Sequence, residues 1–102
     1  MKTELSQGVE LVNSLADCLN VIGNETRFKI VVYCTEERRF TDIVMNLKLN
    51  PASFKFHLGV LTEYGLVEKV ERGVYRTTIL GNMLLKLVQA FDKIANENKE
   101  ND

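Results

Sequence analysis

The stretch NPASFKFHLGVLTEYGL, residues 50–66, carries polar and aromatic side chains on a face that a plain core helix would not need. At helical spacing its apolar residues gather on one side, and the opposite side holds Ala52, Ser53, Lys55, Phe56, Gly59 and Glu63. Lysine binds phosphate or guanine, an aromatic ring makes apolar contacts with bases, and small residues permit close approach. This face suits the floor of a DNA major groove. The alternative for Phe56 is a core position.

The ends of this stretch are typical of one capped helix. Asn50 is a favourable N-cap residue, and Pro51 at the first helical position loses no hydrogen bond. Gly65 suits the left-handed position that follows a helix ending near Tyr64. The inner face is expected to contain Phe54, His57, Leu58, Leu61 and Tyr64.

A shorter helix is expected just before it. Thr41 is predicted to cap this helix, which buries Ile43, Val44 and Leu47, and KLN at 48–50 forms a tight turn. Short helix, turn and capped helix make a helix-turn-helix over residues 41–64. The helix N-termini at Thr41 and Asn50 can each attract a phosphate. EERR at 36–39 is expected to be a solvated break, with phosphate contact by its arginines as the alternative.

The pattern changes after Gly65. LVEKVERGVYRTT, residues 66–78, alternates as two short strands around a turn at residues 71–73. This hairpin carries Lys69, Arg72 and Arg76, so it is expected to be a basic wing beside the helix-turn-helix.

Long helices are predicted at both ends, over residues 1–22 and 79–97, with a further helix over about 25–35. The apolar stripes of the terminal helices are wide enough to cover a partner as well as a core, so a two-fold homodimer is expected. The residues predicted for that interface are Leu5, Val9, Val12, Leu80, Leu84, Leu87, Phe91 and Ile94.

Length and composition bound the class of protein. The chain has 102 residues, 45% of them hydrophobic, so one domain with a single core is expected. No apolar run could cross a membrane and no secretion signal is visible, so the expected location is the cytoplasm. Residues 24–80 hold nine basic and seven acidic residues, a net charge of +2 in a chain of net charge –1. Charge alone therefore favours a nucleic-acid partner only weakly.

Catalytic chemistry has little support. No Gly-rich phosphate loop, no acid pair near a histidine and no nucleophile with a base is visible, so an enzyme, a cofactor and a metal site are not expected. His57 is the lone histidine and is expected to pack or cap. Cys18 and Cys34 lie on apolar stripes and are expected to be small buried hydrophobes, a redox pair being possible only if the helices bring them close.

Three segments resemble the winged helix-turn-helix regulators of the arsenic-repressor-like (ArsR) superfamily. They are GNETRFKI at 23–30, HLGVLTEYGLVEK at 57–69 and YRTTILG at 75–81, and the likeness covers roughly residues 15–81. It implies a mainly α fold with a small β-hairpin, a recognition helix at Pro51–Tyr64 and a wing at Val67–Thr77. The metal ligands of metal-sensing members are missing, because residues 40–49 hold no cysteine and the last helix no histidine.

The resemblance implies a homodimeric regulator that binds operator DNA and carries no metal switch. The sequence does not identify an effector. The alternative function is a winged-helix module that binds another protein of the transcription or replication machinery, which the near-neutral charge favours.

Overall fold

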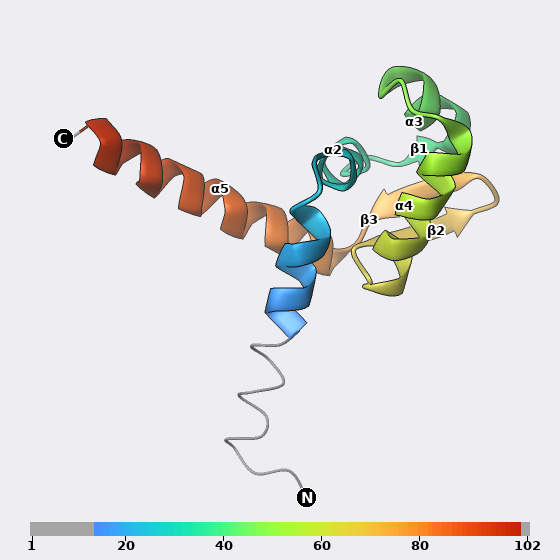
Figure 1. Cartoon of the computed structure of the whole chain (residues 1–102). Coiled ribbons are helices and arrows are strands. Elements are labelled where there is room, and N and C mark those ends of the chain that lie inside the picture. The colour runs from blue at the N-terminus through green and yellow to red at the C-terminus, as the bar shows by residue number, and fades with distance from the viewer. Residues whose placement is uncertain (1–13, 101–102) are drawn as a thin grey trace, which may run out of the picture.

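The computed structural model describes residues 14–100, with side chains described for residues 14–98 (Figure 1). The chain is helical over residues 14–22, here called the N-terminal helix. The elements that follow are α2 (Glu25–Tyr33), β1 (Arg38–Arg39), α3 (Phe40–Asn46), α4 (Pro51–Glu63), β2 (Val67–Glu71), β3 (Val74–Thr77) and α5 (Ile79–Glu100). The chain is thus mainly helical with a small sheet, as predicted. Leu5, Val9 and Val12 lie outside the described residues.

The connection between α3 and α4 is a tight turn, as predicted. The amide of Leu49 donates to the Val44 carbonyl at 2.9 Å and that of Lys48 to the Met45 carbonyl at 3.3 Å. This pair of bonds is the Schellman arrangement, which requires a left-handed residue just past the helix. Lys48 occupies that position with φ of 54°. The turn therefore places α4 directly after α3 with a non-glycine residue in a glycine-like conformation.

The sheet has three antiparallel strands in the order β1-β3-β2, whereas a two-stranded hairpin was predicted. Arg38 and Arg39, expected in a solvated break, pair with Tyr75 and Val74 of β3. A two-residue strand is too short to show alternation, and charged side chains are common on edge strands. The sequence therefore gave no local sign of this pairing.

The predicted cap of α3 was wrong. Arg39 is the N-cap residue and makes no side-chain capping bond, and Thr41 lies within the helix. The amide of Phe40 donates instead to the Gly73 carbonyl of the β2–β3 turn at 2.8 Å. This bond satisfies the first amide of α3 and holds the start of the helix against the wing.

The core lies between the helices and one face of the sheet. Its fully buried side chains include Ile30, Val31, Ile43, Phe54, Leu61 and Leu66. Cys18 and Cys34 form no disulfide with each other and are both buried, as predicted for small hydrophobic side chains. Thr77 is buried and polar, and its hydroxyl donates to the Val31 carbonyl at 2.7 Å. That bond joins β3 to α2.

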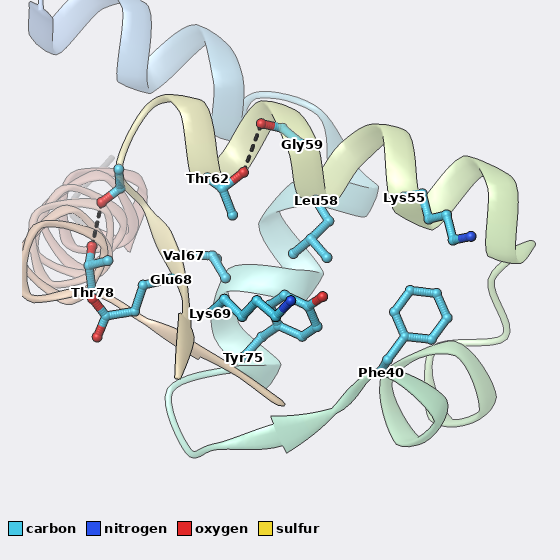
Figure 2. A pocket seen from close by; sticks show the side chains of 11 residues that line it. Phe40, Lys55, Leu58, Gly59, Thr62, Val67, Glu68, Lys69, Tyr75 and Thr78 are labelled. Carbon is cyan, nitrogen blue, oxygen red and sulfur yellow. Dashed lines mark hydrogen bonds between the residues drawn. The ribbon is translucent and has the colours of Figure 1, made fainter. Parts of the chain in front are cut away.

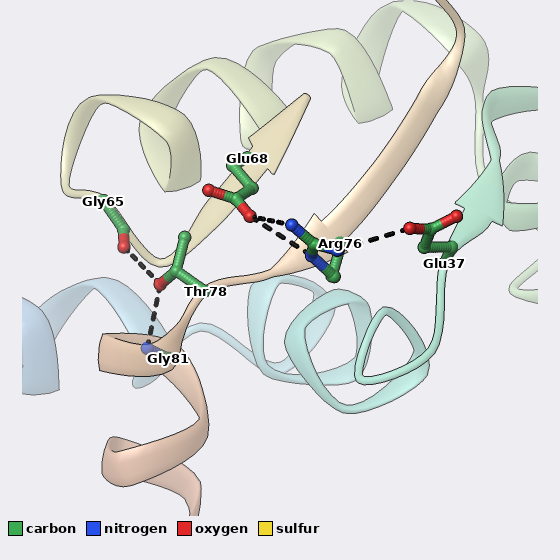
Figure 3. Close-up of polar contacts among 6 residues, drawn as sticks. All are labelled: Glu37, Gly65, Glu68, Arg76, Thr78 and Gly81. Carbon is green, nitrogen blue, oxygen red and sulfur yellow. Dashed lines mark hydrogen bonds and ion pairs between the residues drawn. The ribbon is translucent and has the colours of Figure 1, made fainter. Parts of the chain in front are cut away.

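Helix α5 is anchored where α4 turns into β2. The Thr78 hydroxyl accepts from the Gly81 amide at 3.0 Å and donates to the Gly65 carbonyl at 2.5 Å (Figure 3). Thr78 therefore caps α5, as predicted. A Cβ on Gly81 would lie 2.5 Å from the Leu66 carbonyl oxygen. Helix α5 therefore lies so close to this backbone that only glycine fits at position 81.

Beyond this anchor, α5 extends away from the rest of the domain (Figure 1). It ends at Glu100 rather than near Glu97. Leu84, predicted at a subunit interface, is 5% exposed and belongs to the protomer's own core. Its neighbours on the stripe are exposed: Leu80, Leu87, Phe91 and Ile94. An apolar surface therefore remains on α5 after the domain has folded.

Candidate nucleic-acid interface

The start of α4 is built as predicted. The Asn50 side-chain oxygen accepts from the amides of Ala52 at 2.9 Å and Ser53 at 3.2 Å, and Pro51 is the first helical residue. Two otherwise unpaired amides are thereby satisfied. Asn50 thus stabilises the first turn of α4, which includes the exposed Ser53.

Burial of the inner face of α4 determines which of its side chains point to solvent. Phe54, Leu58 and Leu61 are buried, and the Phe54 ring lies 4.8 Å from that of Phe40 on α3. Tyr64, expected on this face, is 40% exposed. The remaining inner-face prediction, His57, is half-buried at the edge of the face.

The outer face of α4 is exposed along its length. It presents the residues predicted for it: Ala52, Ser53, Lys55, Phe56, Gly59 and Glu63. Phe56 is 66% exposed, so the core alternative for this residue is excluded. A Cβ on Gly59 would meet no atom within 4 Å, so the helix surface is open there. An exposed aromatic ring beside a lysine and small residues is compatible with contact to base edges.

A groove of about 730 Å³ separates α4 from the sheet (Figure 2). Lys55 and Leu58 line it from α4, and Val67, Lys69 and Tyr75 line it from the strands. Neither lysine forms an ion pair with another described residue. The groove therefore joins the exposed face of α4 to the wing and has two amines on its walls.

The tip of the wing lies beside the start of α3. A hollow of about 390 Å³ is lined by Thr41 on α3 and by Arg72 and Gly73 of the β2–β3 turn. Arg72 is exposed and has no ion pair with a described residue. Thr41 and Arg72 thus lie close together although the sequence separates them widely.

Arg76 differs from the other predicted wing contacts, because its charge is already paired (Figure 3). Its guanidinium donates to Glu68 at 2.7 and 3.1 Å and to Glu37 at 3.3 Å. The hydrogen bond and then the charge of Glu68 raise the pKa of Arg76 above its usual value. Surface pairs of this kind contribute little stability, but they reduce the positive potential available to a phosphate. The sequence did not reveal this network, since Glu37 lies far from Arg76 along the chain.

Two further polar contacts were also missed. Arg27 of α2 lies 3.2 Å from the Nδ1 atom of His57, which had been expected to pack or cap. Arg38 stacks over the Tyr33 ring, 4.3 Å from its centroid, and donates to the Tyr33 carbonyl at 3.0 Å. Arg38 is therefore held against α2 rather than extended toward a phosphate.

Some kinds of site are not found in the described part of the chain. Residues 14–98 contain no cluster of three or more His, Cys, Asp or Glu side chains that could hold a metal ion. None of the helices described is long and apolar enough to cross a membrane.

The fold and the exposed helix beside a wing define a class of protein. The family described as winged helix-turn-helix matches residues 24–96, and the chain belongs to this family. Its fold is also that of ArsR-like transcriptional regulators, as the sequence predicted. A comparison with curated proteins found no match.

Several solved structures are similar to this chain. A homodimeric winged helix-turn-helix DNA-binding domain from Mycobacterium bovis, a possible ArsR-family transcriptional regulator, has a TM-score of 0.72 at 23% identity, over 95% of this chain and 92% of that one. NolR from Sinorhizobium fredii has a TM-score of 0.71 at 19% identity, over 92% and 96%. An ArsR-like transcriptional regulator from Rhodococcus has a TM-score of 0.63 at 25% identity, over 89% and 88%.

Proposed function

We propose that this protein is a sequence-specific double-stranded DNA-binding transcriptional regulator that acts as a homodimer. The observation that carries the proposal is the outer face of α4. Its inner side chains are buried in the core, whereas Lys55 and Phe56 are exposed. Lys55 also lines the groove that leads to the wing. A helix held in this way can enter a major groove without disturbing the fold.

The wing and α3 would add contacts that do not depend on sequence. Lys69 and Arg72 are unpaired among the described residues and are assigned here to phosphates or the minor groove. Thr41 lines the same hollow as Arg72 and is therefore assigned to the same stretch of the DNA phosphate backbone. The pairing of Arg76 with Glu68 and Glu37 gives it a lesser part than its neighbours.

The homodimer is supported by the apolar surface between the N-terminal helix and α5. Leu15, Leu80, Met83 and Leu87 line one hollow of about 400 Å³. A second hollow, of about 390 Å³, is lined by Leu19, Leu87, Val88 and Phe91. Phe91 is 73% exposed in the protomer, and apolar surface of this kind is typical of a subunit interface. The similar regulators come from bacteria, whose chromosome lies in the cytoplasm, so the proposed location is the cytoplasm.

The proposal is tested by selecting bound sequences from a pool of random duplexes and measuring the mass of the protein in solution. We expect a palindromic consensus bound by two protomers, because a two-fold dimer presents two copies of α4. A pool that remains random after selection would refute sequence-specific binding.

The second candidate is a module that binds another protein. The overall charge of –1 and the exposed Phe56 favour it, since aromatic residues are enriched in protein interfaces. A salt titration of binding to random duplex separates the two candidates. A protein that binds DNA displaces counterions from the duplex, so its affinity falls steeply as the salt concentration rises. A module that binds only protein would show no affinity for the duplex at any salt concentration.

A further inference from the structure

Arg27 on α2 joins three segments of the chain. Its Nε atom donates to the Val21 carbonyl of the N-terminal helix at 2.7 Å. Its Nη1 atom lies 3.2 Å from Nδ1 of His57 on α4. Its backbone amide donates to the side chain of Asn24, the N-cap of α2, at 3.0 Å. One side chain thus bonds a helix assigned to the dimer interface and the helix assigned to DNA.

The geometry of a guanidinium makes this bridge specific. Its donors are held in a planar fork, so the two bonds fix the position of the Val21 carbonyl relative to the His57 ring. A lysine has one nitrogen and cannot reproduce both directions. His57 follows Phe56 directly in the sequence, and the two rings meet edge to face at 5.5 Å. Movement of the His57 ring therefore affects a side chain assigned to base contact.

We propose that Arg27 is a positioning residue that couples the N-terminal helix, and through it the dimer, to the orientation of α4. The inference rests on the proposed function, because it assigns α4 to DNA and the N-terminal helix to the subunit interface. Arg27 itself need not touch DNA. It acts by holding His57, and thus the centre of α4, at a fixed position relative to the end of the N-terminal helix.

The bridge depends on the protonation state of His57. Arg27 has only donors, so Nδ1 must offer its lone pair, and a protonated imidazole has none to offer. The groups facing the ring are the Arg27 guanidinium from α2 and the Phe56 ring on α4 itself, and the N-terminal helix contributes the Val21 carbonyl to the same bridge. Burial and then the charge of Arg27 hold the pKa of His57 below its ordinary 6.5. The bridge is therefore intact at neutral pH and is lost in acid.

The test compares Arg27→Met, which keeps the aliphatic stem, with two changes at His57. His57→Asn places an acceptor that does not titrate close to the position of Nδ1, and His57→Leu removes it. Lys29→Met is the matched control, because it deletes one charge from the same helix where the partner is Glu25 on α2 itself, at 3.0 Å. The measurements are affinity for the selected duplex and for random duplex, and backbone amide chemical shifts without DNA.

We expect Arg27→Met to weaken binding to the selected duplex about tenfold, with a smaller loss on random duplex. Lys29→Met should reduce both affinities equally. Arg27→Met with His57→Leu should be little worse than either change alone, because both remove the same bond. The affinity of the wild-type protein should fall relative to that of His57→Asn as pH drops below 6.5.

Additive losses in the double variant, or equal pH profiles for wild type and His57→Asn, would overturn the coupling. Amide shifts separate this failure from failure of the proposed function. Arg27→Met must shift the amides of both the N-terminal helix and the outer face of α4 even if no duplex is bound. If these amides do not move, Arg27 does not position α4, whatever the protein binds.

Discussion

At the scale of single residues, the side chains of α4 fall into two groups, those buried in the core and those proposed to contact DNA. Phe56 is 66% exposed, so Phe56→Ala should leave the melting temperature nearly unchanged. The same change should reduce affinity for the selected duplex by about 1–3 kcal/mol if the ring meets a base, with less effect on random duplex. Lys55→Ala should behave alike. Thermal melts and binding isotherms on the same variants measure both quantities.

The control for this prediction is Leu58, which is 7% exposed on the inner face of the same helix. Leu58→Ala should reduce the free energy of unfolding by about 2–5 kcal/mol, because it leaves a cavity in the core. If Phe56→Ala and Lys55→Ala both keep full affinity for the selected sequence, α4 does not enter the groove.

Cys34 should make stability depend on alkaline pH. Burial raises the pKa of the Cys34 thiol from 9.0 to about 11. Above pH 9 the unfolded chain loses this proton while the folded chain keeps it, so the free energy of unfolding should fall between about pH 9 and about pH 11. Denaturant unfolding in the presence of a reductant measures the fall. Cys34→Ala should show a smaller decline, and an identical decline would mean that other groups cause it.

The residue-scale predictions from sequence succeeded where the signal was local. Asn50 and Pro51 mark a helix start within a few positions, and the spacing of Phe54 and Leu58 fixes the buried side. Two contacts were not predicted: the ion pair of Arg76 with Glu37 and the bridge from Arg27 to His57. Each joins residues that only the folded chain brings together, and a charged residue shows no sign of its partner in the sequence.

At the scale of elements, the turn between α3 and α4 contains removable strain. Lys48 has φ of 54°, a conformation that costs most side chains about 1–2 kcal/mol. Lys48→Gly should raise the free energy of unfolding by about 0.5–1 kcal/mol, after allowance for the more flexible unfolded chain. Lys48→Ala is the control, since it removes the charge and keeps the strain. A denaturant midpoint that is no higher for glycine than for alanine would contradict this account.

The wing gives a prediction that contrasts two arginines. Arg72→Ala should weaken binding to all duplexes alike and flatten the salt dependence by about one unit of slope, because one phosphate contact is lost. Arg76→Ala should change the slope less, since its charge is already paired with Glu68 and Glu37. Titrations at several salt concentrations measure both slopes. If Arg72→Ala leaves affinity and slope untouched, the hairpin is not a DNA-binding wing.

Most elements could be predicted from sequence, because helical and alternating periods are strong signals over several residues. The third strand could not, since Arg38 and Arg39 are too few to show a period. The start of α3 could not either, because its first amide is satisfied by Gly73 of the distant wing turn rather than by a neighbouring side chain.

At the scale of the whole molecule, the prediction is assembly. Leu87 is 49% and Phe91 73% exposed on α5, and a partner protomer would cover them. Replacing both by Glu should yield monomers with greatly reduced operator affinity, because one protomer presents one α4. Leu84→Glu is a contrast rather than an interface test, since Leu84 is buried in the protomer and its loss should unfold the chain. Sedimentation and circular dichroism separate these outcomes. A wild-type protein that sediments as a monomer at micromolar concentration would end the dimer hypothesis.

The close approach at Gly81 has a consequence for the operator. A helix of 22 residues is about 33 Å long, so a tilt of about 10° at its base moves its far end by about 6 Å. That displacement is comparable to the rise of about two base pairs, and in a two-fold dimer both copies of α4 would move. The number of base pairs between the two halves of a palindrome would then depend on how α5 leaves the domain. Gly81, which reads no base, would thereby set the spacing of the sequences that are read.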